Sequence, residues 1–246
     1  LGQSVREAAD TVLAELDRTD AWSRSTILLV TTTGQGWVNN WGVAAVEYLS
    51  GGDCATAAIQ HSNLPSPLAF LDAPTRPREA GRVLTRAIEE RLAGLDPGSR
   101  PRFYVTGESL GAYGGNAAFS SVPDLLDRVD GAVWTGTPGF TDLHAELTSQ
   151  RVVGSTELNP VVDNGRHVRF ASNPQQLDAD QFGRALGEWD FPRITYLQHP
   201  SDPVVWWSPS VLVREPQWLN ETRVGTPEEA MSWLPVVTFW QVSADM

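Results

Sequence analysis

The chain has 246 residues, of which 41% are hydrophobic and 20% are charged, proportions that exclude a disordered or fibrous protein. Its net charge of −12 excludes a general nucleic-acid-binding role, because a phosphate backbone requires a basic surface. The single cysteine, Cys54, excludes an internal disulfide, and there is no apolar run of about 18 residues that would span a membrane. We therefore expect residues 1–246 to form a single domain that is soluble as the sequence stands.

The predicted elements alternate between helices and strands. Apolar residues at helical spacing predict a helix over 3–17, and the β-branched run at 26–33 predicts a strand buried on both faces. The further elements, in chain order, are a helix over 43–49, a strand over 54–62, a helix over 76–92, a strand from 102 into a turn at Gly107, a helix from 110, and strands over 131–136, 194–198 and 235–242. This alternation predicts an α/β fold with a mostly parallel central sheet and helices on both faces.

Residues 140–192 interrupt this alternation with a long stretch that contains only short apolar pieces. We expect an insertion near the active-site cleft, either a lid or one wall of the cleft.

A nucleophile motif lies between a predicted strand and a predicted helix. Gly107-Glu108-Ser109-Leu110-Gly111 matches G-x-S-x-G, in which the small flanking residues allow a sharp turn that raises the serine hydroxyl above the sheet edge. The backbone amide of Leu110, at the start of the helix, then faces a developing oxyanion. The alternative interpretation is an ordinary glycine-rich turn between a strand and a helix.

An oxyanion hole needs a second donor, usually from a loop after an earlier strand. Gln35 or Gly36, in the Gly34-Gln35-Gly36-Trp37 loop, is our candidate for a backbone amide, although a plain glycine turn explains the same residues.

Asp202 is the candidate acid, because it follows the predicted strand at 194–198 and an acid follows the serine in the triad order of this fold. An Asp-Pro pair also starts turns for local reasons. The base is harder to assign, since His61, His144, His167 and His199 all precede Asp202.

Three explanations for the base stay open. In the first, the base follows a last strand at 235–242 and lies beyond Met246. In the second, His199, three residues before Asp202, takes the role in an altered geometry. In the third, the site is inactive and the domain only binds. We expect His61 to face the cleft or bond to nearby backbone, and His144 and His167 to lie on the surface of the insertion.

Ten tryptophans are many for this length, and Trp37, Trp206 and Trp207 are candidates to line an apolar substrate cleft. Core and surface packing explains them equally well. No spacing of His, Cys and Asp resembles a metal site, and no glycine-rich phosphate or dinucleotide fingerprint is present, so we expect neither a metal nor a cofactor.

Three segments together, TTTGQGWVN (31–39), VTGESLGAYGG (105–115) and LQHPSDPVVWW (197–207), resemble a bacterial α/β-hydrolase family found chiefly in actinobacteria. The resemblance covers nearly the whole chain and implies an α/β-hydrolase fold, with Ser109 and Asp202 matching the nucleophile and the acid. It also implies a cell-envelope enzyme, associated with the membrane through a multi-helix domain outside this chain, and a short tail containing the histidine base.

The sequence therefore predicts a serine esterase or lipase-like hydrolase that cleaves an acyl ester through an acyl-enzyme on Ser109. The alternatives are an envelope acyltransferase that uses the same acyl-enzyme and a non-catalytic binding module.

Overall fold

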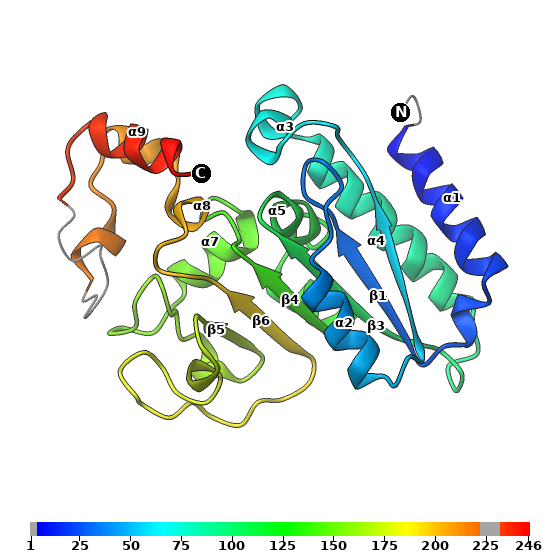
Figure 1. The fold of residues 1–246 in the computed structure, drawn as a ribbon. Helices are drawn as coiled ribbons and strands as arrows, with labels where there is room; N and C mark the ends of the chain where they lie inside the picture. Colours follow the sequence, from blue (N-terminus) through cyan, green and yellow to red (C-terminus); the bar gives the residue numbers. More distant parts are fainter. Residues whose placement is uncertain (1–3, 222–231) are drawn as a thin grey trace. The chain divides into compact units, whose positions relative to one another are not determined.

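The computed structural model describes residues 4–221 and 232–246. Its central element is a six-stranded sheet in the order β2-β1-β3-β4-β6-β5 (Figure 1). The strands are β1 (Thr26–Thr31), β2 (Cys54–Ile59), β3 (Arg102–Glu108), β4 (Gly131–Thr135), β5 (Val168–Ala171) and β6 (Arg193–Leu197). The helices are α1 (Val5–Arg18), α2 (Asn40–Leu49), α3 (Ser66–Asp72), α4 (Arg76–Ala93), α5 (Leu110–Asn116), α6 (Val122–Arg128), α7 (Asp142–Ser149), α8 (Pro203–Trp206) and α9 (Val237–Ala244).

The backbone contacts group the chain into two units, Leu1–Val133 and Trp134–Met246. A single domain over residues 1–246 stays a prediction.

In the first unit β1 is the central strand, and all six of its residues are buried, as a strand covered on both faces requires. It pairs in parallel with β2, from Thr26 opposite Cys54, and with β3, from Thr26 opposite Arg102. Helix α2 lies on one face of these strands, while α4 and α5 pack together on the other (Figure 1). The parallel register brings the carboxyl ends of β1 and β3 to the same edge, where Thr31 lies opposite Gly107.

The second unit contains β5 and β6, which pair in parallel from Val168 opposite Ile194. Strand β5 lies within the predicted insertion at 140–192, so part of that insertion builds the edge of the sheet instead of lying over it. The reason is that β5, although only four residues long, is buried throughout. Its Arg169 is also buried, and the guanidinium donates hydrogen bonds to the carbonyls of Gly165, Leu177 and Gly187.

The strand predicted at 235–242 is wrong, because this segment contains helix α9. Thr238 and Val242, four residues apart, are its buried positions, so burial follows a helical period despite the β-branched composition. Phe239 packs near Trp207, and Ser243 accepts a hydrogen bond from the Trp207 indole at 2.8 Å. These contacts on one helical face explain why β propensity did not decide the structure.

Candidate active site

Ser109 lies alone between strand β3, which ends at Glu108, and helix α5, which begins at Leu110. Its backbone has φ 53° and ψ −118°, outside the ordinary helical and extended regions. A residue other than glycine holds such a conformation only where the surrounding structure imposes it, and such residues concentrate at functional sites. The turn therefore has the strained strand–serine–helix geometry that the G-x-S-x-G pattern predicts.

The two flanking glycines are required by close backbone contacts. A Cβ atom at Gly107 would lie 2.6 Å from the carbonyl oxygen of Gly111, and a Cβ at Gly111 would lie 2.1 Å from the carbonyl oxygen of Thr31. Both distances are far below van der Waals contact, so neither position accepts a side chain without a shift of the backbone. The glycines allow β1, β3 and α5 to approach closely enough to form the turn.

Two backbone amides of the first unit are candidates for an oxyanion hole. Within the part of the chain that the structure describes, the N–H groups of Leu110 and Gln35 donate no hydrogen bond. By contrast, Gly36 donates its N–H to the Thr33 carbonyl at 3.0 Å, and Gly34 donates to Ser66 Oγ at 3.1 Å. Of the two predicted loop donors, Gln35 is therefore the amide that is free to bind a ligand.

Asp202, in the second unit, is held at the N-terminus of the short helix α8. Its Oδ1 accepts the Val204 N–H at 3.0 Å. Its Oδ2 faces Gly136, where an added Cβ would lie 2.8 Å from that oxygen. Gly136 has φ 54° and donates its N–H to the Leu197 carbonyl at 2.8 Å, so the ends of β4 and β6 are joined beside the carboxylate, and the missing side chain at Gly136 leaves room for it.

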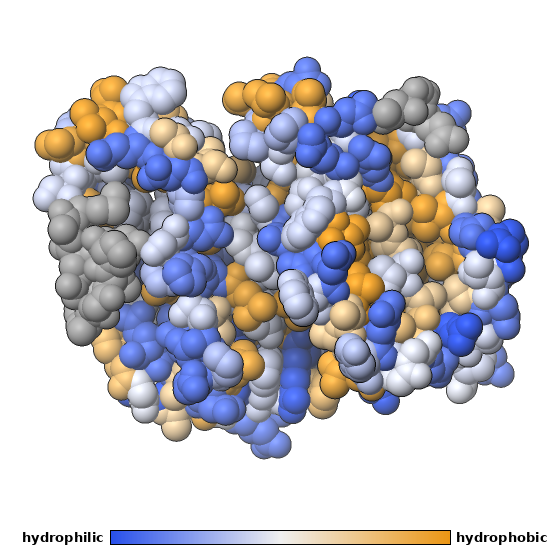
Figure 2. Space-filling view, viewed as in Figure 1, coloured by the Kyte–Doolittle hydropathy of each residue, from blue (hydrophilic) through white to orange (hydrophobic). Residues whose placement is uncertain are grey.

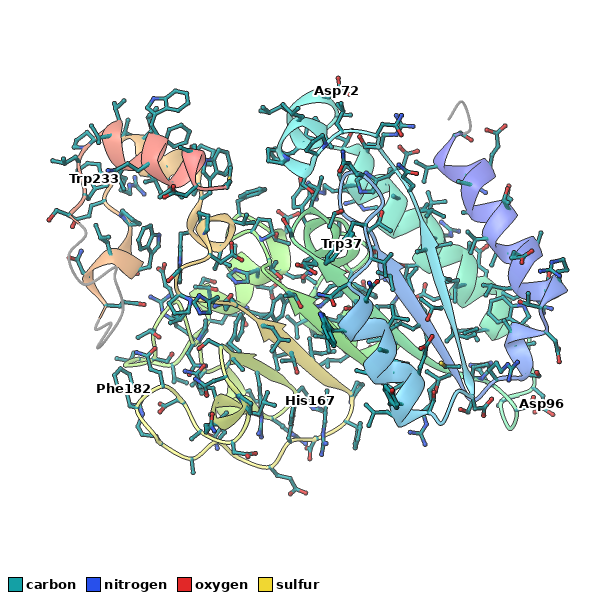
Figure 3. The ribbon with its side chains drawn as sticks, viewed as in Figure 1. Trp37, Asp72, Asp96, His167, Phe182 and Trp233 are labelled. Carbon is teal, nitrogen blue, oxygen red and sulfur yellow. The ribbon has the colours of Figure 1, made fainter. Side chains whose placement is uncertain are left out.

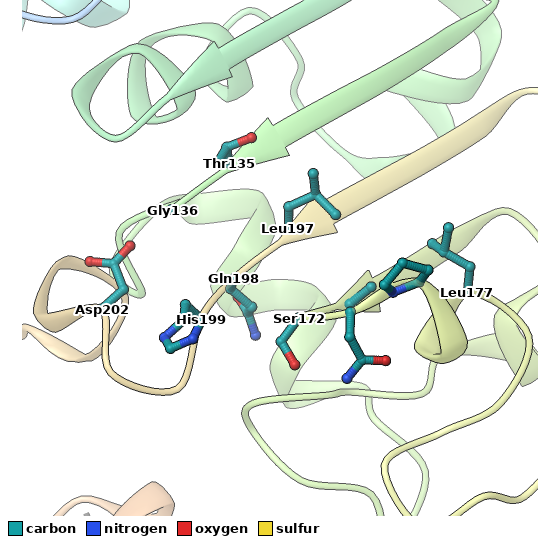
Figure 4. Close-up of a pocket in the computed structure, with 11 residues that line it drawn as sticks. Thr135, Gly136, Ser172, Leu177, Leu197, Gln198, His199 and Asp202 are labelled. Carbon is teal, nitrogen blue, oxygen red and sulfur yellow. The ribbon is translucent and has the colours of Figure 1, made fainter. Parts of the chain in front are cut away.

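Asp202 borders a cavity of about 400 Å³ at the carboxyl ends of β4, β5 and β6 (Figure 4). The lining includes the apolar side chains of Leu177 and Leu197 and the polar ones of Ser172 and His199. This volume lies within the range of small-molecule sites. Because Ser172 and Leu177 come from the segment 140–192, part of the predicted insertion forms a wall of this cavity.

His199 lies on the same loop as Asp202 and is exposed. Its Nδ1 accepts a hydrogen bond from the backbone N–H of Ser201 at 3.2 Å. A neutral His199 in this arrangement carries its proton on Nε2, so Nδ1 has no proton to donate to a carboxylate. A triad base has the opposite arrangement, with Nδ1–H directed at the acid.

The other three histidines make structural hydrogen bonds. His61 is buried and its Nε2 donates to the Thr32 carbonyl at 3.1 Å, which is the backbone contact anticipated for it. The surface position predicted for His144 is wrong, because α7 directs this side chain into the core, where Nε2 donates to Gln198 Oε1 at 2.9 Å. His167 is half-buried and bonds through Nδ1 to the Pro192 carbonyl at 3.2 Å.

The tryptophans proposed for the cleft have different environments. Trp37, labelled in Figure 3 ahead of α2, is 51% exposed. Trp206 is buried, with its ring 5.2 Å from that of Trp218, and its indole N–H bonds to the Pro200 carbonyl. Together with Trp207 it lines a second cavity, of about 540 Å³, that does not include Asp202. Packing accounts for much of the surface of Trp206 and Trp207.

Two residues with a position in the site went unrecognised in the sequence. Asn39 caps helix α2 and donates from Nδ2 to Glu108, the residue before Ser109, and Gly136 leaves room for the Asp202 carboxylate. An asparagine directly before an apolar helix is a capping signal, and a glycine directly after a strand signals a positive φ. Neither signal reveals the distant partner.

Over residues 4–221 and 232–246, no group of three or more His, Cys, Asp or Glu residues is arranged to hold a metal ion. Among the helices of those residues, none is long and apolar enough to cross a bilayer.

The sheet of largely parallel strands, with a strained serine between a central strand and a helix, defines the α/β-hydrolase class of folds. A family model described as the alpha/beta-hydrolase family matches residues 2–246, and the chain belongs to this family.

Two further comparisons accompany this assignment. Among solved structures, the chain is similar to a Trichoderma reesei cutinase in complex with a C11Y4 phosphonate inhibitor, with 11% identity and a TM-score of 0.41 over 82% of this chain and 76% of that chain. No curated protein matched the chain.

Proposed function

We propose that the chain is a serine hydrolase that cleaves an acyl ester through an acyl-enzyme on Ser109. The observation that carries this proposal is the backbone of Ser109, held at φ 53° by two close-packed glycines. A strained, half-buried serine at the edge of a sheet has a structural cost that a plain turn would avoid, and nucleophilic catalysis is a function that accounts for this cost. The proposed location in the cell envelope rests on the sequence resemblance alone.

In the proposed reaction, Ser109 Oγ attacks the acyl carbonyl carbon while a base takes the hydroxyl proton. The C–O bond to the alcohol then breaks, the alcohol leaves with that proton, and water releases the acid from the serine. The free amides of Leu110 and Gln35 are the proposed donors to the oxyanion.

Asp202 is the proposed acid, because its carboxylate is held by the Val204 N–H, lies against Gly136 at the end of β4, and borders a cavity large enough for an imidazole and part of a substrate. His199 serves as the base only if its ring turns so that Nδ1 leaves the Ser201 amide.

Hydrolysis of p-nitrophenyl esters from acetate to palmitate tests the proposal. We expect activity that Ser109→Ala abolishes and that Ser99→Ala, at an exposed serine in a loop, leaves unchanged. A fluorophosphonate probe gives an independent readout, since labelling that is equal in the protein and in Ser109→Ala would contradict the assignment.

His199→Ala combined with added imidazole tests the base. If His199 is the base, the variant loses Ser109-dependent activity and millimolar imidazole restores part of it. If activity is unchanged by His199→Ala, another group is the base. If the unsubstituted chain is inactive and imidazole activates it, the imidazole supplies a base that residues 1–246 do not provide.

A further inference from the structure

The loop after β2 and helix α3 form an exposed apolar segment next to the candidate site. Residues 62–71 read SNLPSPLAFL and contain no ionisable side chain. Leu64 is 36% exposed, Leu68 53% and Leu71 76%. Leu68 and Leu71 are three residues apart in α3 and so share one side of that helix, and Leu64 lies in the loop just before it. We call these three residues the leucine stripe. Figure 2 shows hydrophobic residues gathering on the surface over α3.

The leucine stripe is anchored to the proposed oxyanion loop. Ser66 Oγ accepts the Gly34 N–H, and an added Cβ at Gly34 would lie 2.5 Å from the Leu64 carbonyl oxygen. Since Gln35 is the next residue, α3 packs directly against the backbone that carries the free amide.

The same helix is also anchored to the nucleophile helix. The ring of Phe70 packs edge-on against Tyr113, with 5.6 Å between centroids, and Tyr113 donates its N–H to the Ser109 carbonyl at 3.0 Å. While Phe70 points inward to this contact, Leu68 and Leu71 point to solvent. The apolar surface is therefore held in place beside the elements that carry Ser109 and Gln35.

The charges argue for an uncharged occupant. The chain has a net charge of −12, so a second copy or an anionic membrane would be repelled. The segment itself offers no ionic partner between Ser62 and Leu71, and Asp72, labelled in Figure 3, closes it with a negative charge.

The small area of the leucine stripe also favours a lipid surface over a protein partner. Three leucine side chains present much less than the roughly 800 Å² per partner that a stable protein–protein interface buries. Partial insertion of a few apolar side chains is, by contrast, how peripheral proteins bind a lipid surface.

We propose that the leucine stripe docks on an uncharged lipid surface, such as a zwitterionic bilayer or an emulsion of neutral lipid. Docking there would present the candidate site to water-insoluble acyl esters, a substrate class that rests on the proposed function. The docking itself does not depend on catalysis.

Flotation with phosphatidylcholine vesicles tests the docking, and the Ser109→Ala variant is used so that hydrolysis plays no part. We expect binding that is unchanged between 0.1 and about 1 M salt, because apolar insertion is not screened. Leu68→Gln/Leu71→Gln should weaken binding about tenfold or more, from the lost burial of two leucines. The matched control is Tyr48→Gln/Leu49→Gln on α2. Both of these side chains are at least as exposed as the two leucines, at 87% and 89%, and this variant should bind vesicles normally.

A label on the stripe provides a measurement that does not rely on the glutamine variants. In a Cys54→Ala background, an environment-sensitive fluorophore at Leu71→Cys should shift to the blue when vesicles are added, and one at Leu49→Cys should not.

Absence of flotation, equal losses in both glutamine pairs, or binding restricted to anionic vesicles would each overturn the docking proposal. Flotation by a protein that hydrolyses no ester, with or without added imidazole, would support docking while contradicting the proposed function.

Discussion

Asn39 Nδ2 donates a hydrogen bond to Glu108 Oε2 at 2.9 Å and so joins two segments that lie 69 residues apart. The Oδ1 atom of the same asparagine accepts the N–H groups of Trp41 and Gly42 at 3.0 and 3.2 Å and caps helix α2. One side chain therefore fixes the loop that carries Gln35 relative to the residue before Ser109.

We predict that Asn39→Asp lowers kcat for ester hydrolysis about tenfold to a hundredfold, with a smaller change in KM, through disturbance of the oxyanion loop. Aspartate retains the cap but replaces the donor with a carboxylate that faces Glu108. Steady-state kinetics on p-nitrophenyl butyrate, together with the midpoint of thermal unfolding, checks this.

Two further variants show whether the lost Asn39–Glu108 hydrogen bond causes the fall in kcat. Asn40→Asp introduces the same charge one residue later, at an exposed position, and should be close to normal. Asn39→Asp/Glu108→Gln restores the hydrogen bond with its direction reversed and should recover most of kcat. If the double variant is no better than Asn39→Asp, the bond does not position the loop.

The close approach of Gly111 to the Thr31 carbonyl predicts that a side chain at position 111 is destabilising. Gly111→Ala should reduce the free energy of unfolding by about 3 kcal/mol, because a Cβ placed 2.1 Å from that oxygen forces β1 and α5 apart. Gly42→Ala is the control, since nothing lies within 4 Å of its Cβ inside helix α2, and it should stabilise by roughly 0.5–1 kcal/mol. Urea denaturation measures both, and equal effects would contradict the steric argument.

Most of the sheet could be predicted because its strands are largely apolar or lie beside a recognisable turn. The segment 26–33 predicted β1, which is buried at all six positions, and the elbow pattern located the end of β3 and the start of α5. These features are local, so the sequence expresses them directly.

The elements and contacts that the sequence did not predict depend on residues distant along the chain. The edge strand β5 is short and contains a buried arginine whose carbonyl partners lie 4 to 18 residues away. Helix α9 follows from packing with Trp207, and the close approach of Asp202 to Gly136 joins residues 66 positions apart. Periodicity and motifs do not encode such pairs.

Gly136 supplies a test of the acid. We predict that Gly136→Ala lowers kcat/KM by at least tenfold, because the new methyl group displaces the Asp202 carboxylate from its position. Gly183→Ala is the matched control, since Gly183 also has a positive φ, of 76°, but nothing lies within 4 Å of its Cβ. Both variants have similar backbone strain, so an equal loss of activity in the two would assign the effect to strain alone.

The pH dependence of stability should report His61 and His144. Burial lowers the pKa of both side chains below the ordinary value of 6.5, with the His61–Thr32 and His144–Gln198 hydrogen bonds opposing that shift. Below about pH 6.5 the unfolded chain binds protons at these positions and the folded chain does not. The free energy of unfolding should therefore be fully retained above pH 6.5 and fall as the pH decreases, by up to about 1.4 kcal/mol per pH unit for each histidine.

Urea denaturation between pH 7.5 and 5 isolates these histidines, because carboxyl groups with an ordinary pKa near 4 stay ionised there. In His144→Gln the glutamine amide can still donate to Gln198, but one titrating group is removed, so the slope below pH 6.5 should fall by about half. The slope is the informative quantity, since packing changes alter stability at every pH. A slope identical to that of the unsubstituted chain would show that His144 is not held neutral by the fold.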